Sequence, residues 1–350
     1  MKRDIAVIRL LLHAAILLPL IFWGCDVNSP KEETFSNDRS FMQNKLLGRG
    51  INIGNALEAP NEGEWGVTLQ ADYFTKIRSA GFSSVRLPIR WSAHCSGSFP
   101  YTIDQAFLNR VEWAVNQSLN SGLAVIINMH HYNDLFSFPE EEKSRFLSLW
   151  KQIGERFKNY DSRLFFEILN EPNGNLTPER WNVFLKNALD TIRVSNPERT
   201  VIIGTAEWGG FSSVSKLSLP AGDKNLIVTV HYYQPFQFTH QGAEWVEGSN
   251  AWLGTTWNGS AGELQMMESD FLQAVTWARQ KNIPLNLGEF GAYNKAWMTS
   301  RVKWTAAVRQ LAEKYSMSWN YWEFCAGFGI YDRTTAQFNP ALLGALIPPV

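Results

Sequence analysis

Short apolar runs, many of them rich in β-branched residues, alternate with longer amphipathic segments from about residue 45 onward. Most of these runs are apolar at successive positions, which is typical of parallel strands covered by helices on both faces. They predict eight strands, namely Ile51–Ala56, Val85–Ile89, Ala124–His130, Leu164–Asn170, Thr200–Thr205, Leu226–His231, Pro284–Glu289 and Trp319–Phe324.

The segments between the predicted strands carry apolar residues at helical spacing. Phe146, Trp150 and Ile153 are separated by four and then three positions, which places them on one face of a helix. A second apolar stripe begins after Thr177 and Pro178, a favourable pair for an N-cap and a first turn. We interpret these stripes as core-facing helices without a chemical role. The connection between the fifth and sixth strands is predicted to be short and weakly helical.

Eight strands alternating with helices over about 300 residues predict one α/β domain, folded as a (β/α)8 TIM barrel. A doubly wound open sheet would alternate in the same way, but it would normally carry a glycine-rich phosphate-binding loop after its first strand. Here the first strand leads into Asn55–Pro60, with the sequence NALEAP, which offers no phosphate cradle. The sequence therefore favours the closed barrel.

The first 25 residues are predicted to be an export signal that is not part of the fold. Lys2 and Arg3 precede an apolar run over residues 10–23, as in a signal peptide. Cys25 follows the small residue Gly24, which predicts a bacterial lipoprotein signal with Cys25 as the lipidated first residue; plain secretion is the alternative. We therefore expect an exported protein, either secreted or anchored at the cell surface or in the periplasm, whose only membrane contact is this lipid.

The remainder of the chain is predicted to be one tether and one domain. Residues 26–40 are polar and predict the tether, which leaves residues 41–350 for the barrel. Three cysteines do not form a disulfide framework. With Cys25 modified, Cys95 and Cys325 are predicted to be free thiols, because they follow different strands and nothing in the sequence brings them together.

Composition indicates a packed globular protein with many aromatic rings. Hydrophobic residues make up 45% of the chain, charged residues 19%, and the formal net charge is -1. Without a run of basic residues, the sequence predicts no nucleic-acid partner, and we expect a monomer. The chain has 15 tryptophans, and rings in loops commonly serve as stacking surfaces for ligands. Six lie in predicted loops: Trp65, Trp91, Trp208, Trp245, Trp252 and Trp257.

Two glutamates lie where barrel enzymes carry their chemistry. Glu171 follows the fourth predicted strand and Glu289 ends the seventh, and the carboxyl ends of barrel strands converge on one mouth. Burying a carboxylate without a partner is costly, so two of them at this mouth indicate a function. A structural salt bridge at a strand end would explain either residue alone, but it does not explain the pair.

Glycoside hydrolysis requires such a pair. In a retaining mechanism, one carboxylate attacks the anomeric carbon while the other protonates the leaving oxygen, and the two groups are roughly 5 Å apart. The acid needs a raised pKa, whereas the nucleophile must stay ionised. Arg86, in the second predicted strand, is a candidate donor for holding the nucleophile anionic. This chemistry needs no cofactor.

Neighbouring strands end in further polar and aromatic residues. His130 and His131 end the third strand and His231 ends the sixth. Successive strand residues face opposite sides, and the chain lacks a His/Asp cluster of clear metal spacing, so we predict hydrogen-bonding groups and no metal. Trp322, near the end of the eighth strand, suits stacking on the apolar face of a sugar ring. Its neighbour Glu323 is expected to face away and to be structural.

Six segments in this order carry a resemblance: Val85–Pro88 (VRLP), His130–Tyr132 (HHY), Leu169–Pro172 (LNEP), His231–Tyr233 (HYY), Gly288–Gly291 (GEFG) and Tyr321–Phe324 (YWEF). Together they resemble glycoside hydrolase family 5, especially its cellulase and mannanase subgroup from thermophilic bacteria. The resemblance covers about residues 40–345. The Asn-Glu-Pro sequence is moderately specific by itself, whereas the ordered set is highly specific.

The resemblance implies roles for the residues at the barrel mouth. Glu171 matches the general acid/base and Glu289 the nucleophile. Asn170 matches the residue that hydrogen-bonds the sugar 2-hydroxyl, a bond that strengthens in an oxocarbenium-like transition state. Arg86 and Tyr233 resemble the groups that orient and ionise the nucleophile.

The remaining candidates resemble sugar contacts along a cleft. Trp322 matches the sugar platform and Trp245 a cleft wall. Asn55 and Glu58, after the first strand, are weaker matches for sugars further along. The subsite histidines by this resemblance are His130, His131 and His231.

The expected function is endo-cleavage of β-1,4-linked glucan, with mannan or glucomannan as additional substrates, so the expected partner is a β-linked polysaccharide or oligosaccharide. A dedicated β-mannanase or a xyloglucan or lichenan hydrolase would share every catalytic residue, because these sugars differ in details that motifs do not fix. A surface glycan-binding protein without catalysis is a further alternative. The intact pair of glutamates argues against it, since a binder needs neither a proton donor nor a nucleophile.

Overall fold

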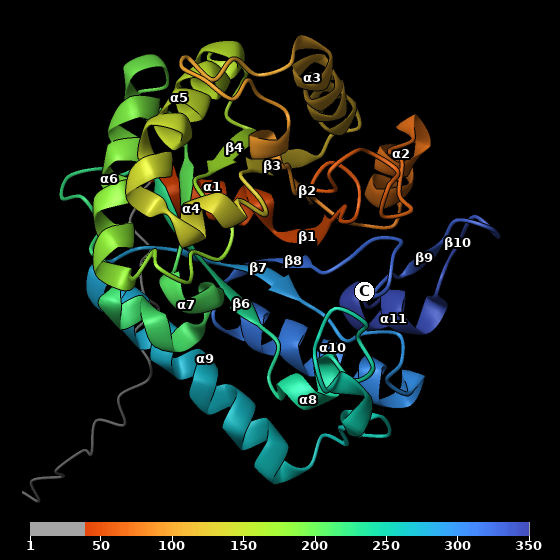
Figure 1. Cartoon of the computed structure of the whole chain (residues 1–350). Coiled ribbons are helices and arrows are strands. Elements are labelled where there is room, and N and C mark those ends of the chain that lie inside the picture. Colours follow the sequence, from red (N-terminus) through yellow and green to blue (C-terminus); the bar gives the residue numbers. More distant parts are fainter. Residues whose placement is uncertain (1–38, 350) are drawn as a thin grey trace, which may run out of the picture. The chain divides into compact units, whose positions relative to one another are not determined.

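Eight parallel strands close into one barrel in chain order (Figure 1). The structure, a computed structural model, describes residues 39–349, so the predicted export signal and Cys25 lie outside the described residues. The strands are β1 (Arg49–Asn52), β2 (Ser84–Leu87), β3 (Ala124–Asn128), β4 (Leu164–Glu167), β5 (Val201–Gly204), β6 (Leu226–Tyr232), β7 (Leu285–Phe290) and β8 (Ser318–Tyr321). Pairing of β1 with β8 closes the ring. The predicted (β/α)8 fold is confirmed.

Helices alternate with the strands of the barrel. The described helices are α1 (Arg39–Leu47), α2 (Ala71–Ser79), α3 (Gln105–Asn120), α4 (Asn133–Ser137), α5 (Pro139–Phe157), α6 (Pro178–Ser195), α7 (Ala206–Gly209), α8 (Phe236–Thr239), α9 (Ala261–Lys281), α10 (Met298–Lys314) and α11 (Pro340–Leu346). Three 3-10 helices are η1 (Trp91–Ala93), η2 (Phe211–Lys216) and η3 (Ser249–Trp252), and a small antiparallel sheet pairs β9 (Tyr331–Asp332) with β10 (Gln337–Phe338). Among the described residues, none of these helices combines the length and apolarity needed to span a membrane.

Local sequence explains where several helices begin. Thr177 caps α6 by accepting a hydrogen bond from the Arg180 N–H, and Pro178 occupies the first turn, as the sequence predicts. Ser260 and Glu263 form a reciprocal capping box at the start of α9. Helix α1 begins at Arg39, inside the segment that the sequence assigns to the tether. As predicted, the connection between β5 and β6 contains only the short helices α7 and η2.

The first strand begins earlier than the apolar pattern predicts. β1 starts at Arg49 and ends at Asn52, whereas the apolar run starts at Ile51. Arg49 can open a strand because its guanidinium reaches outward to Glu313, 2.8 Å away. The Ile53 N–H still donates to the Arg86 carbonyl, so the ladder contact continues one residue beyond the assigned strand. Apolar runs therefore mark the buried part of a strand better than its ends.

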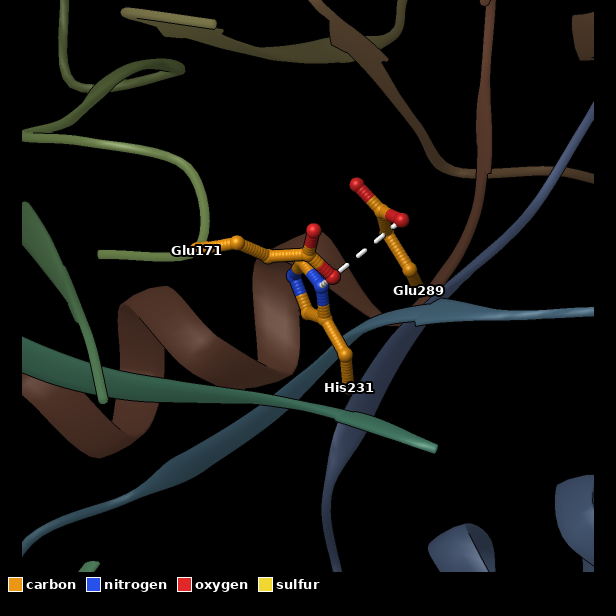
Figure 2. A group of neighbouring side chains, drawn as sticks. All are labelled: Glu171, His231 and Glu289. Carbon is orange, nitrogen blue, oxygen red and sulfur yellow. Dashed lines mark hydrogen bonds and ion pairs between the residues drawn. The ribbon is translucent and has the colours of Figure 1, made fainter. Parts of the chain in front are cut away.

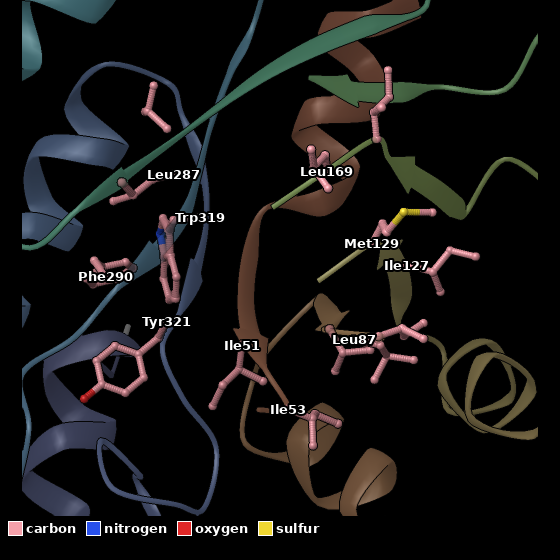
Figure 3. Close-up of a cluster of buried hydrophobic side chains, with 14 of the residues drawn as sticks. Ile51, Ile53, Leu87, Ile127, Met129, Leu169, Leu287, Phe290, Trp319 and Tyr321 are labelled. Atoms are coloured by element: carbon pink, nitrogen blue, oxygen red, sulfur yellow. The ribbon is translucent and has the colours of Figure 1, made fainter. Parts of the chain in front are cut away.

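Apolar side chains fill two layers separated by the barrel wall. Side chains that point outward, such as Ile127, Leu287 and Trp319, pack against the helices (Figure 3). A smaller cluster occupies the barrel interior near α1, and its members are Leu47, Ala124, Ile126, Phe165, Ile202 and Ile227. Because strand residues alternate between the two faces, the next inward positions toward the carboxyl ends are polar ones, including Asn128 and Glu167. The barrel thus has an apolar base beneath a polar layer.

Two of the six tryptophans in predicted loops belong to the core and are not stacking surfaces for a ligand. Trp91 and Trp257 are buried. The Trp91 indole N–H donates to the Asn128 carbonyl at 2.8 Å, so its polar atom is satisfied without solvent. Cys95 and Cys325 are free thiols, as predicted.

Candidate active site

Glu171 and Glu289 face one another across a single cleft of about 1260 Å³ at the carboxyl end of the barrel. Glu289 lies within β7, and Glu171 follows β4. His231 from β6 lies beside both, with its Nδ1 2.8 Å from Glu171 Oε1 and 3.6 Å from Glu289 Oε2 (Figure 2). One ligand atom from each of these residues lies within 4.8 Å of the others. The expected convergence of the two glutamates on one cavity is therefore met.

Arg86 organises the floor of the cleft through all five of its N–H donors. Nε and Nη2 form a two-pronged pair with Glu167, at 2.6 and 2.7 Å. Nη1 donates to Asn52 Oδ1 at 2.8 Å and to Glu289 Oε1 at 2.7 Å, and Nη2 also donates to Asn170 Oδ1 at 2.7 Å. Burial lowers the pKa of Arg86, but the charges of Glu167 and Glu289 outweigh it and hold the pKa above its usual value. The guanidinium is thus a fixed positive charge.

Glu289 is more deeply buried than Glu171, with 6% of its side chain exposed against 22%. Burial raises the pKa of Glu289, while the charges of His231 and Arg86 oppose that rise. The Tyr233 hydroxyl donates to Glu289 Oε2 at 2.9 Å. Donors therefore surround this carboxylate, which is the environment that a nucleophile needs to stay ionised.

The backbone of β6 and β7 brings His231 to the two carboxylates. The register between these strands shifts between Val230 and His231, so that His231 pairs opposite Glu289. Gly288 leaves room for the ring, since a Cβ there would lie 3.1 Å from His231 Nε2. Burial lowers the pKa of His231, but the Glu289 charge and the Glu171 hydrogen bond outweigh it and raise the pKa above its usual value.

Asn170 and Glu171 occupy the turn that leaves β4. Glu171 has a φ of 46°. Residues other than glycine rarely adopt this left-handed backbone conformation, and those that do are concentrated at functional sites. Asn170 is buried and accepts from Arg86, and it lies beneath the cleft rather than among the residues of its wall. The unusual backbone conformation of Glu171 and the buried hydrogen bond of Asn170 to Arg86 thus fix where the two side chains lie.

Both His130 and His131 line the cleft, so strand alternation was the wrong guide for them. β3 ends at Asn128, and His131 has a φ of 53°, so the two residues are no longer in a strand. Their ring centroids are 4.3 Å apart. Burial lowers the pKa of both residues, that of His131 to about 4, so both act as neutral hydrogen-bonding groups at neutral pH.

Trp322 and Trp245 lie in the cleft wall, where the sequence predicts sugar-stacking rings. Trp322 stacks parallel to His130 with centroids 5.9 Å apart. The weaker candidates Asn55 and Glu58 line the same cleft. Glu58 also accepts hydrogen bonds from the N–H groups of Asn55 and of the following residue, and burial raises its pKa to about 8. It therefore supports its own loop as well as facing the cleft.

Glu323 is structural, as the sequence predicts. Its carboxylate is buried and accepts backbone hydrogen bonds from Cys325, Ala326 and Phe328. Burial raises its pKa to about 7. The residue fixes the loop after β8, next to Trp322, and is not among the residues of the cleft wall.

The profile of the cellulase family, glycosyl hydrolase family 5, matches residues 48–327. This chain belongs to glycosyl hydrolase family 5. Endoglucanase H of Acetivibrio thermocellus is 38% identical over 315 residues, which cover 88% of this family 5 chain. The chain spans only about a third of that relative, 34% of its length, and 32% of cellulase/esterase CelE from the same organism.

Solved structures of family 5 proteins match almost end to end. Cel5A of Thermotoga maritima, in complex with mannotriose, is 55% identical with a TM-score of 0.87, over 88% of this chain and 100% of that one. A broad-specificity GH5-4 endoglucanase from Clostridium acetobutylicum is 28% identical with a TM-score of 0.78, over 88% of this chain and 99% of that one. This family 5 chain therefore has the same barrel fold as solved structures at 55% and at 28% sequence identity.

Sequence reasoning missed several residues of the family 5 site. Glu167 and Asn52 hold Arg86, and the alternation of Phe165 with Glu167 along β4 would have placed Glu167 inward. Trp65 was noted only as a loop ring, although it lines the cleft. A further group of lining residues, from loops that carry no motif, comprises Glu207, Gln234, Phe236, His240, Tyr293 and Phe328.

Glu171, His231 and Glu289 also have the ligand types and spacing of a possible metal site, which the search for metal spacing along the sequence did not find. Each could offer one ligand atom. However, Glu289 already accepts from Arg86 and Tyr233, and Glu171 is paired with His231. A cation here would have to compete with a fixed guanidinium for Glu289.

Proposed function

We propose that this chain hydrolyses β-1,4-linked glucan within the polymer, with retention of the anomeric configuration, and that it also accepts mannan or glucomannan. Glu171 is the general acid/base and Glu289 the nucleophile. The observation that carries the proposal is the meeting of these two carboxylates in one cleft. One carboxylate oxygen of Glu171 lies within 4.8 Å of one of Glu289. Inverting enzymes hold their two carboxyl groups roughly 6.5–9.5 Å apart, because a water must fit between one of them and the sugar. The shorter distance here therefore favours retention.

The reaction follows from the two positions. Protonated Glu171 donates to the glycosidic oxygen while Glu289 attacks the anomeric carbon, giving a covalent glycosyl-enzyme and releasing the aglycone. Ionised Glu171 then removes a proton from water, which attacks the same carbon and frees Glu289. Arg86 and Tyr233 hold the attacking carboxylate in place. His231, between the two glutamates, stabilises negative charge as the proton moves.

Substitution of each glutamate tests the assignment of roles. A dinitrophenyl leaving group departs without a proton, so Glu171→Ala should retain far more activity on dinitrophenyl cellobioside than on cellopentaose. Glu289→Ala should lose both, because no glycosyl-enzyme forms. Losses of about 10³-fold or more are expected where a role is required. Substantial residual hydrolysis by Glu289→Ala would remove it from the nucleophile role, and NMR detection of an inverted product would refute retention.

Several observations support a β-1,4-glucan substrate with mannan as a second one. The family 5 neighbour Cel5A has been solved with mannotriose and with cellobiose, and the GH5-4 neighbour is described as broad in specificity. Glucose and mannose differ in the orientation of one hydroxyl, a difference to which stacking on the aromatic rings of the cleft wall contributes little discrimination. Side-by-side rates on carboxymethylcellulose, barley glucan, glucomannan and xyloglucan test this proposal, and activity confined to mannan would contradict it.

We also propose that the protein is exported, with Cys25 lipidated as a membrane anchor and the barrel acting as a monomer. The support is the charged and apolar pattern of residues 1–25 and the polar stretch after it. Mass spectrometry of the mature N-terminus tests the cleavage site and the lipid. Cys25→Ser should release the protein from membranes, whereas an unchanged membrane fraction would refute the anchor. Analytical ultracentrifugation tests the oligomeric state.

A further inference from the structure

Helix α1 presents its larger apolar side chains to solvent. Its buried positions are mainly polar: Ser40, Asn44 and Leu47. On the opposite side of the helix, Met42 and Leu46 are 55% and 40% exposed, and Lys45 between them is also exposed. A surface helix normally has the reverse pattern, with apolar residues inward and polar residues outward. The outer side of α1 therefore has the pattern of a contact surface.

This helix covers the amino end of the barrel. Leu47 packs with the apolar side chains at the base of the barrel interior, among them Ala124 and Phe165, and α1 contacts β3, β6 and β8. The cleft lies at the carboxyl end of the same strands. A partner on the outer side of α1 would therefore leave the cleft open at the other end of the barrel.

Other exposed residues continue this surface across the base. Val194, in the last turn of α6, is 85% exposed, and the ion pair between Arg39 and Glu198 joins the start of α1 to the loop after α6. Lys224 and Lys281 are exposed where the chain enters β6 and β7. We call this set the base surface, and its members are Met42, Lys45, Leu46, Val194, Lys224 and Lys281.

The base surface carries a local excess of positive charge. Asp223, next to Lys224, is paired with Arg193 at 2.7 Å, and Glu198 is paired with Arg39. Within residues 39–349, by contrast, none of the lysines of the base surface takes part in an ion pair. Apolar side chains beside lysines are typical of a helix that lies on a bilayer, where lysine stems extend toward anionic headgroups.

The chain before α1 supports a membrane as the partner. Residues 26–38 separate Cys25, the proposed lipidation site, from Arg39. A chain of that length spans at most about 50 Å when fully extended, so a lipid on Cys25 would keep the start of α1 within that distance of the bilayer. Tethering of this kind gives an effective concentration on the order of millimolar. A small surface can then be occupied, although it would not hold a free protein.

We propose that the base surface docks on the anionic face of the phospholipid bilayer that holds the lipid anchor. Met42 and Leu46 enter the boundary between headgroups and acyl chains, and Lys45 contacts the headgroups. Docking directs the cleft away from the membrane, toward polymer outside it. This inference rests on the proposed lipidation of Cys25, and it does not depend on the roles of the two catalytic glutamates.

Lysine footprinting tests the orientation of the protein on the membrane. The lipidated protein is reconstituted into vesicles of equal parts phosphatidylglycerol and phosphatidylcholine and labelled with a membrane-impermeant succinimidyl ester. Lys45, Lys224 and Lys281 should label several-fold more slowly than in vesicles of phosphatidylcholine alone, because anionic headgroups cover them. Lys295, exposed between β7 and α10 at the cleft end, should label at the same rate in both. Mass spectrometry reads the label at each lysine.

Substitution of the exposed apolar pair tests the contact itself. Met42→Gln with Leu46→Gln should raise the labelling of Lys45 on anionic vesicles to the rate on phosphatidylcholine vesicles, with hydrolysis of soluble glucan unchanged. Leu264→Gln with Met266→Gln is the matched control, because these side chains are 41% and 72% exposed in the first two turns of α9. Those turns lie toward the cleft end, since α9 runs back from there to the amino end of β7. The control pair should leave the labelling of Lys45 unchanged.

Three results would overturn the docking: slowing at Lys295 equal to that at Lys45, labelling of Lys45 at the same rate on both kinds of vesicle, or equal effects of the two variant pairs. A second measurement separates this inference from the proposed anchor. A polyhistidine tag in place of Cys25 tethers the mature chain to anionic vesicles through a nickel-chelating lipid. If Cys25 carries no lipid but the tagged protein shows the footprint at Lys45, only the anchor fails. If the tagged protein shows no footprint, the docking fails.

Discussion

The cleft has a floor, formed by Arg86 and its hydrogen-bond partners, and a wall of loop residues, and the two differ in how their side chains are held. In the floor, Arg86 donates each of its N–H groups to a buried acceptor, and its partner Glu167 is as inaccessible to solvent as the guanidinium itself. In the wall, Trp208 and Trp245 are 64% and 60% exposed. Floor residues determine one another's positions, whereas wall rings are held by the loops that carry them.

This difference separates chemistry from recognition. A change in the floor leaves a buried charge without its partner, so stability and catalysis should fall together. A change in the wall removes contact area that solvent already reaches, so binding should fall while stability holds. The following predictions test that separation, beginning with the largest expected effect.

Removal of Glu167 should damage the floor most. Glu167→Ala leaves Arg86 with one carboxylate fewer, and breaking a buried pair of this kind costs roughly 3–5 kcal/mol. Urea denaturation measures the free energy of unfolding. Asp190→Asn is the matched control, because it breaks an ion pair with Lys186 in which both side chains are 60% exposed, and its cost should stay below about 0.5 kcal/mol. Equal costs for the two variants would refute a charge-locked floor.

His231 should give the floor a distinctive pH dependence. Its pKa is raised, so the folded protein binds the proton more tightly than the unfolded chain does. The stabilisation is complete below the unfolded pKa of about 6.5 and is lost as pH rises through the raised folded value. The difference in unfolding free energy between wild type and His231→Asn should therefore be larger at pH 5 than at pH 9.

His240 provides the control of opposite sign. Burial lowers its pKa to about 4, so the folded protein binds this proton less tightly, and the stability contributed by the neutral ring is lost as pH falls below about 6.5. The difference in unfolding free energy between wild type and His240→Asn should thus decrease toward low pH, whereas the corresponding difference for His231→Asn increases. Two slopes of the same sign would contradict the charge assignment of His231.

Trp245 tests the wall. Trp245→Ala should raise KM on soluble glucan about five- to tenfold with kcat nearly unchanged, while the free energy of unfolding changes by less than about 1 kcal/mol. Trp257→Ala removes a ring that is only 2% exposed and should cost roughly 3–5 kcal/mol. Steady-state kinetics and denaturation on both variants give the comparison. A large stability loss in Trp245→Ala would place that ring in the core.

The sequence predicts the barrel and the two glutamates because both depend on local patterns. Parallel strands need continuous apolar runs, and their carboxyl ends meet at one mouth whatever the loops do, so Glu171 and Glu289 could be placed without coordinates. The partners of Arg86 are harder to predict from sequence, because Asn52 and Glu167 come from separate strands and their contact with Arg86 depends on the register of the barrel.

The wall is less predictable for a different physical reason. Whether a loop ring faces the cleft depends on loop conformation. Trp91 is an example, because the sequence places it in a loop with the other candidate stacking rings, whereas the ring packs in the core. The orientation of His131 depends on a single positive φ outside β3. The spacing of apolar residues along the chain predicts neither orientation, because it reports only on helices and strands and not on loops.

Metal removal should have the smallest effect. Glu171, His231 and Glu289 have the spacing of a metal site, but the Arg86 guanidinium lies 2.7 Å from Glu289, so a divalent cation there would meet a fixed positive charge. Activity should therefore survive prolonged dialysis against EDTA within error. Added Zn²⁺ should at most inhibit, by competing with the proton for Glu171 and His231. Loss of activity on chelation with recovery on adding one metal would instead make the cluster a metal centre and remove Glu289 from the nucleophile role.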